Sequence, residues 1–194
     1  MKNNLSKYIS GILLILMLIS SSCATRGIHD KYLGATEQRL ITQSIDKLIK
    51  KLPEQDFSIL KGKKIYLECY FLEDSEFLKY AKKRIELELM EKYNGTLFAE
   101  PESADMVLHV FFNAIGTDQD KAGFKTPDFI IPGVGGAVSI DIITLDMYHG
   151  ISELYYYIID QKNMVITRGE KIRSTVRTDK LSFPIISIPI NTLD

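Results

Sequence analysis

The sequence predicts an α+β fold: a mixed, mainly antiparallel sheet with two main helices packed on one face. The order of its segments supports this, because two stretches with apolar residues at three- and four-residue spacing alternate with short β-forming stretches, and a run of β-forming stretches follows. Composition agrees with a folded domain, since 45% of the 194 residues are hydrophobic and 25% are charged. We place a single domain at residues 36–194.

The first 22 residues have the layout of a signal peptide. Lys2 and Lys7 precede an apolar run over residues 9–19, and the small residues Ser20, Ser21 and Ser22 follow it. The run is shorter than the roughly 20 apolar residues that a membrane-spanning helix needs. We therefore expect residues 1–22 to direct export.

Cys23 makes this expectation more specific. The segment resembles a bacterial lipoprotein signal, in which small residues precede a cysteine that is lipidated and becomes the new N-terminus. A diacylglyceryl group on Cys23, built from fatty acids such as palmitate, supplies the two chains that stable anchoring requires. Ala24 and Thr25 follow with no Asp, which favours the outer membrane, with the protein facing the periplasm. Cleavage to a soluble exported protein and an uncleaved N-terminal anchor remain alternatives.

Helices are predicted at two places after a tether. Residues 23–35 form the lipidated cysteine and a small, polar tether. From Thr36 the apolar residues lie on a single helical face until Pro53 ends the helix. A second helix runs to about Tyr93, with Asp74 or Ser75 as its cap and Asn94-Gly95 at its end.

Strands are predicted around these helices and after them. The segments over residues 65–72, 96–98 and 106–115 are rich in β-forming residues. A Gly- and Pro-rich loop is expected over 116–136. Strands at 137–148, 154–159 and 164–176 follow, with turns at Gly150 and at residues 160–163. Pro184 and Pro189 cannot donate hydrogen bonds, so residues 183–190 can form only an edge strand or a packed tail.

Four short stretches carry a resemblance that covers most of residues 36–175: Asp56–Ser58 followed by Leu60–Ile65, Ala104–Leu108, Gly116–Asp118 and Ile130–Gly133. Their order and spacing resemble a family of uncharacterised bacterial lipoproteins with a domain of unknown function. More distantly, they are similar to the periplasmic domain of curli-secretion lipoproteins and the N-terminal domain of the Tol translocation protein. The resemblance implies an accessory of envelope assembly or transport, and it supplies no catalytic residues.

The sequence lacks the residues and motifs that several kinds of function require. A net charge of −1 argues against nucleic-acid binding. No Gly-x-Ser-x-Gly motif is present, and His29, His109 and His149 are scattered along the chain. Asp118-Gln119-Asp120 lacks the later ligands of a calcium loop. Cys69, without a partner once Cys23 is lipidated, is expected to be a buried free thiol. We expect no cofactor, no metal and no enzymatic activity.

Contact residues are predicted in two places. The loop over 116–136 contains apolar residues where polar ones are usual, and the strand near residue 155 contains three consecutive tyrosines. The candidate contact residues are Phe129, Ile130, Ile131, Val134, Tyr155, Tyr156 and Tyr157. We expect a non-enzymatic envelope protein, anchored to the membrane by its N-terminal lipid, that acts through contacts with an envelope protein. The alternative is a periplasmic lipoprotein that binds a small apolar or lipidic ligand under the 116–136 loop.

Overall fold

The computed structural model describes residues 25–27, 34–72, 74–130, 137–160 and 164–191. Its helices are α2 (Ala35–Ile49), α3 (Glu54–Phe57) and α4 (Glu76–Tyr93), with short 3-10 turns η1 (Ser58–Leu60) and η2 (Pro101–Ser103). The main sheet contains β1 (Thr25–Gly27), β2 (Lys64–Tyr70), β3 (Thr96–Phe98), β4 (Met106–Lys125), β7 (Asp141–Asp160), β8 (Val165–Arg168), β9 (Ile172–Ser182) and β10 (Ser187–Asn191). Strands β5 (Phe129–Ile130) and β6 (Ala137–Val138) form a separate two-stranded sheet.

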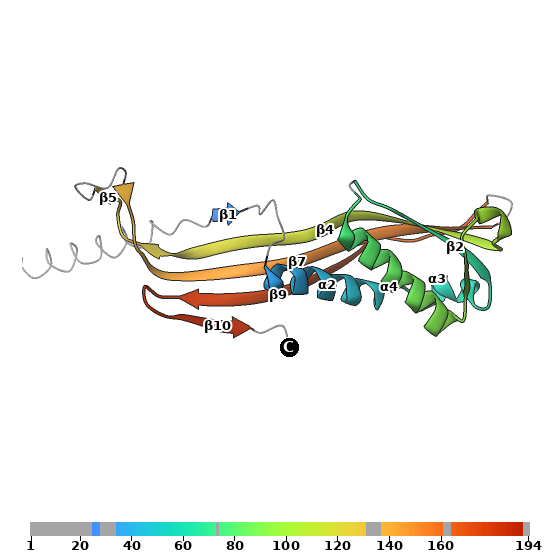
Figure 1. The fold of residues 1–194 in the computed structure, drawn as a ribbon, viewed down its shortest axis with the longest axis horizontal. Coiled ribbons are helices and arrows are strands. Elements are labelled where there is room, and N and C mark those ends of the chain that lie inside the picture. The colour runs from blue at the N-terminus through green and yellow to red at the C-terminus, as the bar shows by residue number, and fades with distance from the viewer. Residues whose placement is uncertain (1–24, 28–33, 73, 131–136, 161–163, 192–194) are drawn as a thin grey trace, which may run out of the picture.

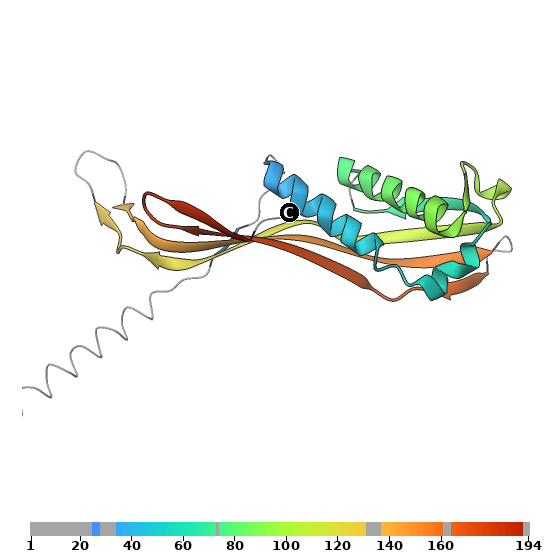
Figure 2. The same cartoon turned by 90° about the horizontal axis from the view of Figure 1, so that it is seen from below.

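The fold is α+β, as predicted. The eight-stranded sheet has the order β10-β9-β7-β4-β2-β3, with β1 beside β4 and β8 beside β7. Strand β2 is parallel to β3 and β4, and the other pairs are antiparallel. Helices α2 and α4 cover one face at one end of this elongated molecule, and the sheet continues past them as a long ribbon (Figures 1 and 2).

Both predicted helices form for the expected local reasons. In α2 the residues at three- and four-residue spacing are buried, from Leu40 to Ile49. Ser75 caps the start of α4, and its side-chain oxygen accepts a hydrogen bond from the Leu78 backbone N–H at 3.2 Å. Asn94 caps the end of the helix and adopts the left-handed conformation with φ 51°.

The core lies between these helices and the covered half of the sheet. Strand β4 alternates buried and partly exposed residues from Met106 to Phe112, so only one face is covered there. The buried strand residues of the core are Ile65, Leu67, Met106, Leu108, Val110, Phe112, Ile115, Leu154, Tyr156 and Ile158.

Gly150 shows how closely α2 packs on the sheet. A Cβ at this position would lie 2.5 Å from the carbonyl carbon of Leu40 and closer still to its oxygen. One turn further along α2, the buried hydroxyls of Ser44 and Ser152 are 2.6 Å apart. The prediction of a turn at Gly150 is therefore wrong, because this glycine lies inside β7 and allows the helix backbone to approach.

The long strands also correct the prediction of a loop over 116–136. Strand β4 continues to Lys125 and pairs with β7 in register from Gly116 opposite Ile151 to Phe124 opposite Ile143. Glycines and polar residues suggested a loop, but pairing along both strands satisfies their backbone hydrogen bonds. Likewise, the strands predicted at 137–148 and 154–159 are joined in a single strand over residues 141–160, and residues 137–138 form β6 of the separate sheet.

The C-terminal part of the sheet contains more strands than the sequence predicted. Residues 164–176, predicted as one strand, contribute to β8 and β9, with residues 169–171 between them. Strand β10 lies at the edge of the sheet, in agreement with the restriction that Pro184 and Pro189 impose. Within the predicted tether, Thr25–Gly27 forms strand β1 beside β4.

Candidate functional site

Aromatic rings form a continuous row on the sheet face that the helices leave open. Tyr70 of β2, Phe111 of β4 and Tyr155 of β7 are cross-strand neighbours. Their rings stack nearly parallel, with centroids 4.6 Å apart for the first pair and 5.1 Å for the second. Tyr157 meets both Phe111 and Tyr155 edge-on. We call these four residues, Tyr70, Phe111, Tyr155 and Tyr157, the aromatic face.

Polar and charged groups border the aromatic face. The Arg168 guanidinium lies 5.7 Å from the centroid of the Tyr157 ring. On the other side, His109 Nδ1 is 3.4 Å from Glu68 Oε2 and 3.3 Å from the Tyr70 hydroxyl. Partial burial, followed by the Glu68 carboxylate, raises the pKa of Tyr70 to about 12. The hydroxyl therefore stays protonated at neutral pH.

An open depression adjoins the aromatic face. It is lined by Asn113, Tyr155, Tyr157, Arg168, Gly169, Glu170 and Lys171. Beside it, Lys171 Nζ lies 2.7 Å from the carboxylate of Glu153, a nearly buried residue. The hydrogen bond from Lys171 lowers the pKa of Glu153, and a hydrogen bond from Asn113 acts in the same direction, against the opposing effect of burial. The depression thus combines flat aromatic surface with fixed charges.

The three predicted tyrosines do not share one face. Tyr155 and Tyr157 lie on the open face, whereas Tyr156 is fully buried beneath the helices. Its hydroxyl donates a hydrogen bond of 2.5 Å to Asp56 Oδ2, and its ring packs edge-on against Phe57 at 4.8 Å. Tyr156 is therefore a core residue and does not belong to a contact surface.

The contact residues predicted in the 116–136 loop are described only in part by the structure. Ile130 lies in β5 and is 78% exposed. The backbone of Phe129 lies in the same strand, but its side chain, Ile131 and Val134 are outside the described residues, as is Cys23. Because residues 116–125 are strand, they do not form the loop that was expected to cover a ligand.

Further exposed apolar residues lie at the end of the ribbon, and the sequence analysis did not name them as a site. They are Phe124, Ile140, Ile142, Ile143, Phe183, Ile185 and Ile186. A usable signal was present. Ile142-Ile143 is an apolar pair that breaks the alternation of a strand with one buried face, and Ile185-Ile186 is an apolar pair in the turn between β9 and β10.

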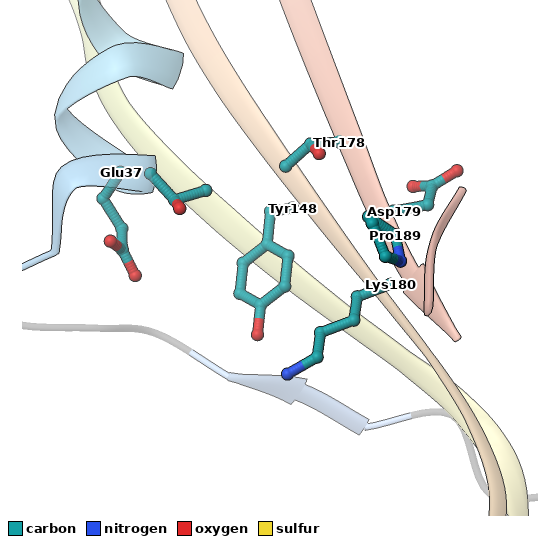
Figure 3. Close-up of a pocket in the computed structure, with 7 residues that line it drawn as sticks. Glu37, Tyr148, Thr178, Asp179, Lys180 and Pro189 are labelled. Atoms are coloured by element: carbon teal, nitrogen blue, oxygen red, sulfur yellow. The ribbon is translucent and has the colours of Figure 1, made fainter. Parts of the chain in front are cut away.

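A pocket of about 420 Å³ lies where the start of α2 faces β7 and β9 (Figure 3). Tyr148 stands at its centre, and Glu37 and Lys180 lie on either side of the ring. The hydroxyl of Tyr148 accepts a hydrogen bond from Gln119 at 3.2 Å, and burial raises its pKa. Charged groups line this pocket, so its chemistry differs from that of a site for an apolar ligand.

The groups that most often carry catalysis are dispersed. His109 contacts Glu68, and His149 lies 3.5 Å from Asp120 much further along the ribbon. Burial raises the pKa of Cys69 to about 12, so its thiol is protonated and unreactive at neutral pH. Within the described ranges, no three His, Cys, Asp or Glu side chains gather closely enough to hold a metal ion.

No protein-family model and no curated protein matches the chain. Among the helices of the described residues, none combines the length and apolar character needed to cross a membrane.

Proposed function

We propose that the protein is a lipid-anchored component of the bacterial envelope that acts without catalysis, through contacts that its aromatic face makes with a partner protein. The observation that carries the proposal is the ordered row of Tyr70, Phe111 and Tyr155 on a sheet face free of helices. Partly exposed aromatic rings with nearby polar groups are typical of the centre of protein interfaces.

The N-terminal sequence supports the proposed export and membrane anchoring of the protein. Residues 1–22 have signal-peptide layout and precede Cys23, and no Asp follows the cysteine, which favours the outer membrane. Mass spectrometry of the N-terminal peptide tests this directly: a diacylglyceryl group on Cys23 is expected. An unmodified cysteine in the mature protein would contradict the anchor.

Site-specific photo-crosslinking in living cells tests the contact. A photoreactive phenylalanine analogue in place of Tyr157 should capture a defined envelope protein, and Tyr155→Ala in the same chain should abolish the product. The matched control carries the analogue at Met90, which is 50% exposed on α4, in the helical layer on the other side of the sheet. Equal products from both positions, or none from Tyr157, would refute a specific contact.

A further inference from the structure

The end of the ribbon furthest from the helices is apolar and exposed. It is formed by two neighbouring hairpin ends, the one between β4 and β7 and the one between β9 and β10 (Figures 1 and 2). Pairing of Thr144 with Ser182 holds the two ends side by side. We call the exposed side chains there the apolar tip: Phe124, Ile130, Ile140, Ile142, Ile143, Phe183, Ile185 and Ile186.

The apolar tip is unlike the stem that carries it. Ile185 is 94% exposed and Ile186 62% exposed, although the domain buries other isoleucines completely. Beyond the tip, polar contacts take the place of apolar ones: Gln119 of β4 bonds to Tyr148 of β7, and Arg177 bonds to Asp179 within β9. Apolar side chains are therefore concentrated where nothing in the described chain covers them, which is the usual mark of a contact with a partner or a lipid phase.

The register of β1 indicates where the N-terminal lipid would lie relative to the apolar tip. Thr25 pairs with Lys121 of β4, three residues before Phe124, a separation of about 10 Å along the strand. Strand β1 runs antiparallel to β4, so Thr25 is the end of β1 that lies nearer the tip. Cys23 is two positions before Thr25 in the sequence, so the Cα atoms of the two residues lie within about 7 Å of each other. An acyl group on Cys23 would attach the protein to the bilayer beside its apolar tip.

The charges of the tip favour hydrocarbon over an anionic surface. In the described segments 121–130, 139–146 and 180–188, Lys121, Lys125 and Lys180 are balanced by Asp128, Asp141 and Asp146. Lys121 is also paired with Asp141 at 2.6 Å. With no excess of positive charge, binding must come from apolar burial, and phosphatidylcholine alone should support it.

We propose that the apolar tip inserts into the interfacial region of the membrane that holds the Cys23 lipid. This inference rests on the anchor of the proposed function and adds a second, protein-based membrane contact. It also fixes an orientation, in which the ribbon is a stem that holds the helices and the aromatic face away from the lipid. Tyr155 lies twelve residues along β7 from Ile143, so this distance is up to about 40 Å.

Tryptophan fluorescence tests the orientation, since the chain has no native Trp. Full-length protein is expressed with Ile185→Trp, purified after mass spectrometry confirms the lipid, and reconstituted into phosphatidylcholine vesicles. The matched control is Val165→Trp, at a residue that is 57% exposed and pairs with Ile159 at the opposite end of β7. Brominated phosphatidylcholine should quench the tip tryptophan at least about twofold and leave the control unchanged, because only the tip reaches the acyl region.

Each other outcome overturns the inference. Equal quenching at both positions means that the protein lies flat, and quenching at neither means that a protein partner or a second copy covers the tip. Adding Ile142→Asp and Ile186→Asp to the Ile185→Trp protein should abolish the quenching, and its persistence would also refute the role of these side chains. Failure of the Tyr157 crosslink alongside a quenched Ile185→Trp would reject the partner contact alone, whereas an unmodified Cys23 removes the basis of both proposals.

Discussion

Gly150→Ala is the substitution that most directly probes how the helical layer docks on the sheet. The added methyl group would lie 2.5 Å from the carbonyl carbon of Leu40 and closer to its oxygen, so α2 or β7 must move. Backbone atoms cannot rotate aside as a flexible side chain can, and forced overpacking of this kind costs about 1–3 kcal/mol. Displacing α2 would also stretch the buried contact of Ser44 with Ser152, at a further cost of about 1 kcal/mol or more.

The expected loss of stability is therefore about 2–4 kcal/mol. With a urea m-value of about 2 kcal/mol/M for a domain of this size, the midpoint of urea unfolding should fall by about 1–2 M. Thr175→Ala on the neighbouring strand is the control, because Thr175 is exposed and should change stability by no more than about 0.5 kcal/mol. Adding Leu40→Ala should not restore stability, since the main clash is with the backbone. An unchanged midpoint for Gly150→Ala would show that α2 does not approach β7 as described.

Three further predictions concern single side chains. Tyr156→Phe should destabilise the domain by about 1–3 kcal/mol in urea unfolding, because it leaves Asp56 without its hydrogen bond from a buried hydroxyl, and a neutral result would contradict this role. Cys69 should react with Ellman's reagent far more slowly at pH 8 than it does in urea, because burial raises its pKa to about 12; equal rates would show that the thiol is exposed. The pKa of Glu153 is lowered in the folded state, chiefly by Lys171, so its contribution is present above the unfolded pKa of about 4.3 and is lost as the pH falls through the folded value. Lys171→Ala should accordingly destabilise the protein at pH 7 but not at pH 3, and the same loss at both values would point to packing instead.

Sequence patterns were sufficient to predict a helix where one of its faces is buried. In α2 the apolar spacing from Leu40 to Ile49 predicted the face that packs on the sheet. Asp74 or Ser75 and Asn94-Gly95 marked the ends of α4, because capping chemistry is local, and the structure shows that Ser75 is the cap. These features needed no knowledge of the neighbours along the fold.

The ribbon could not be predicted in the same way. Alternation of apolar and polar residues arises only where a strand has one covered face, and between Gly116 and Lys121 both faces of β4 are partly open. Gly150 was misinterpreted for a related reason, since a glycine required by close packing and a glycine required by a turn look alike in one sequence. The apolar pairs at 142–143 and 185–186 become a surface only because two hairpin ends meet.

The sequence by itself determined the class of fold and the positions of the two main helices, because these depend on helical and strand periodicity alone. Only the tertiary structure decided which tyrosines are buried and that most of the exposed isoleucines gather at one end. Both depend on where the helical layer stops and how β7 pairs with β4 and β9, and these long-range contacts leave no local pattern in the chain.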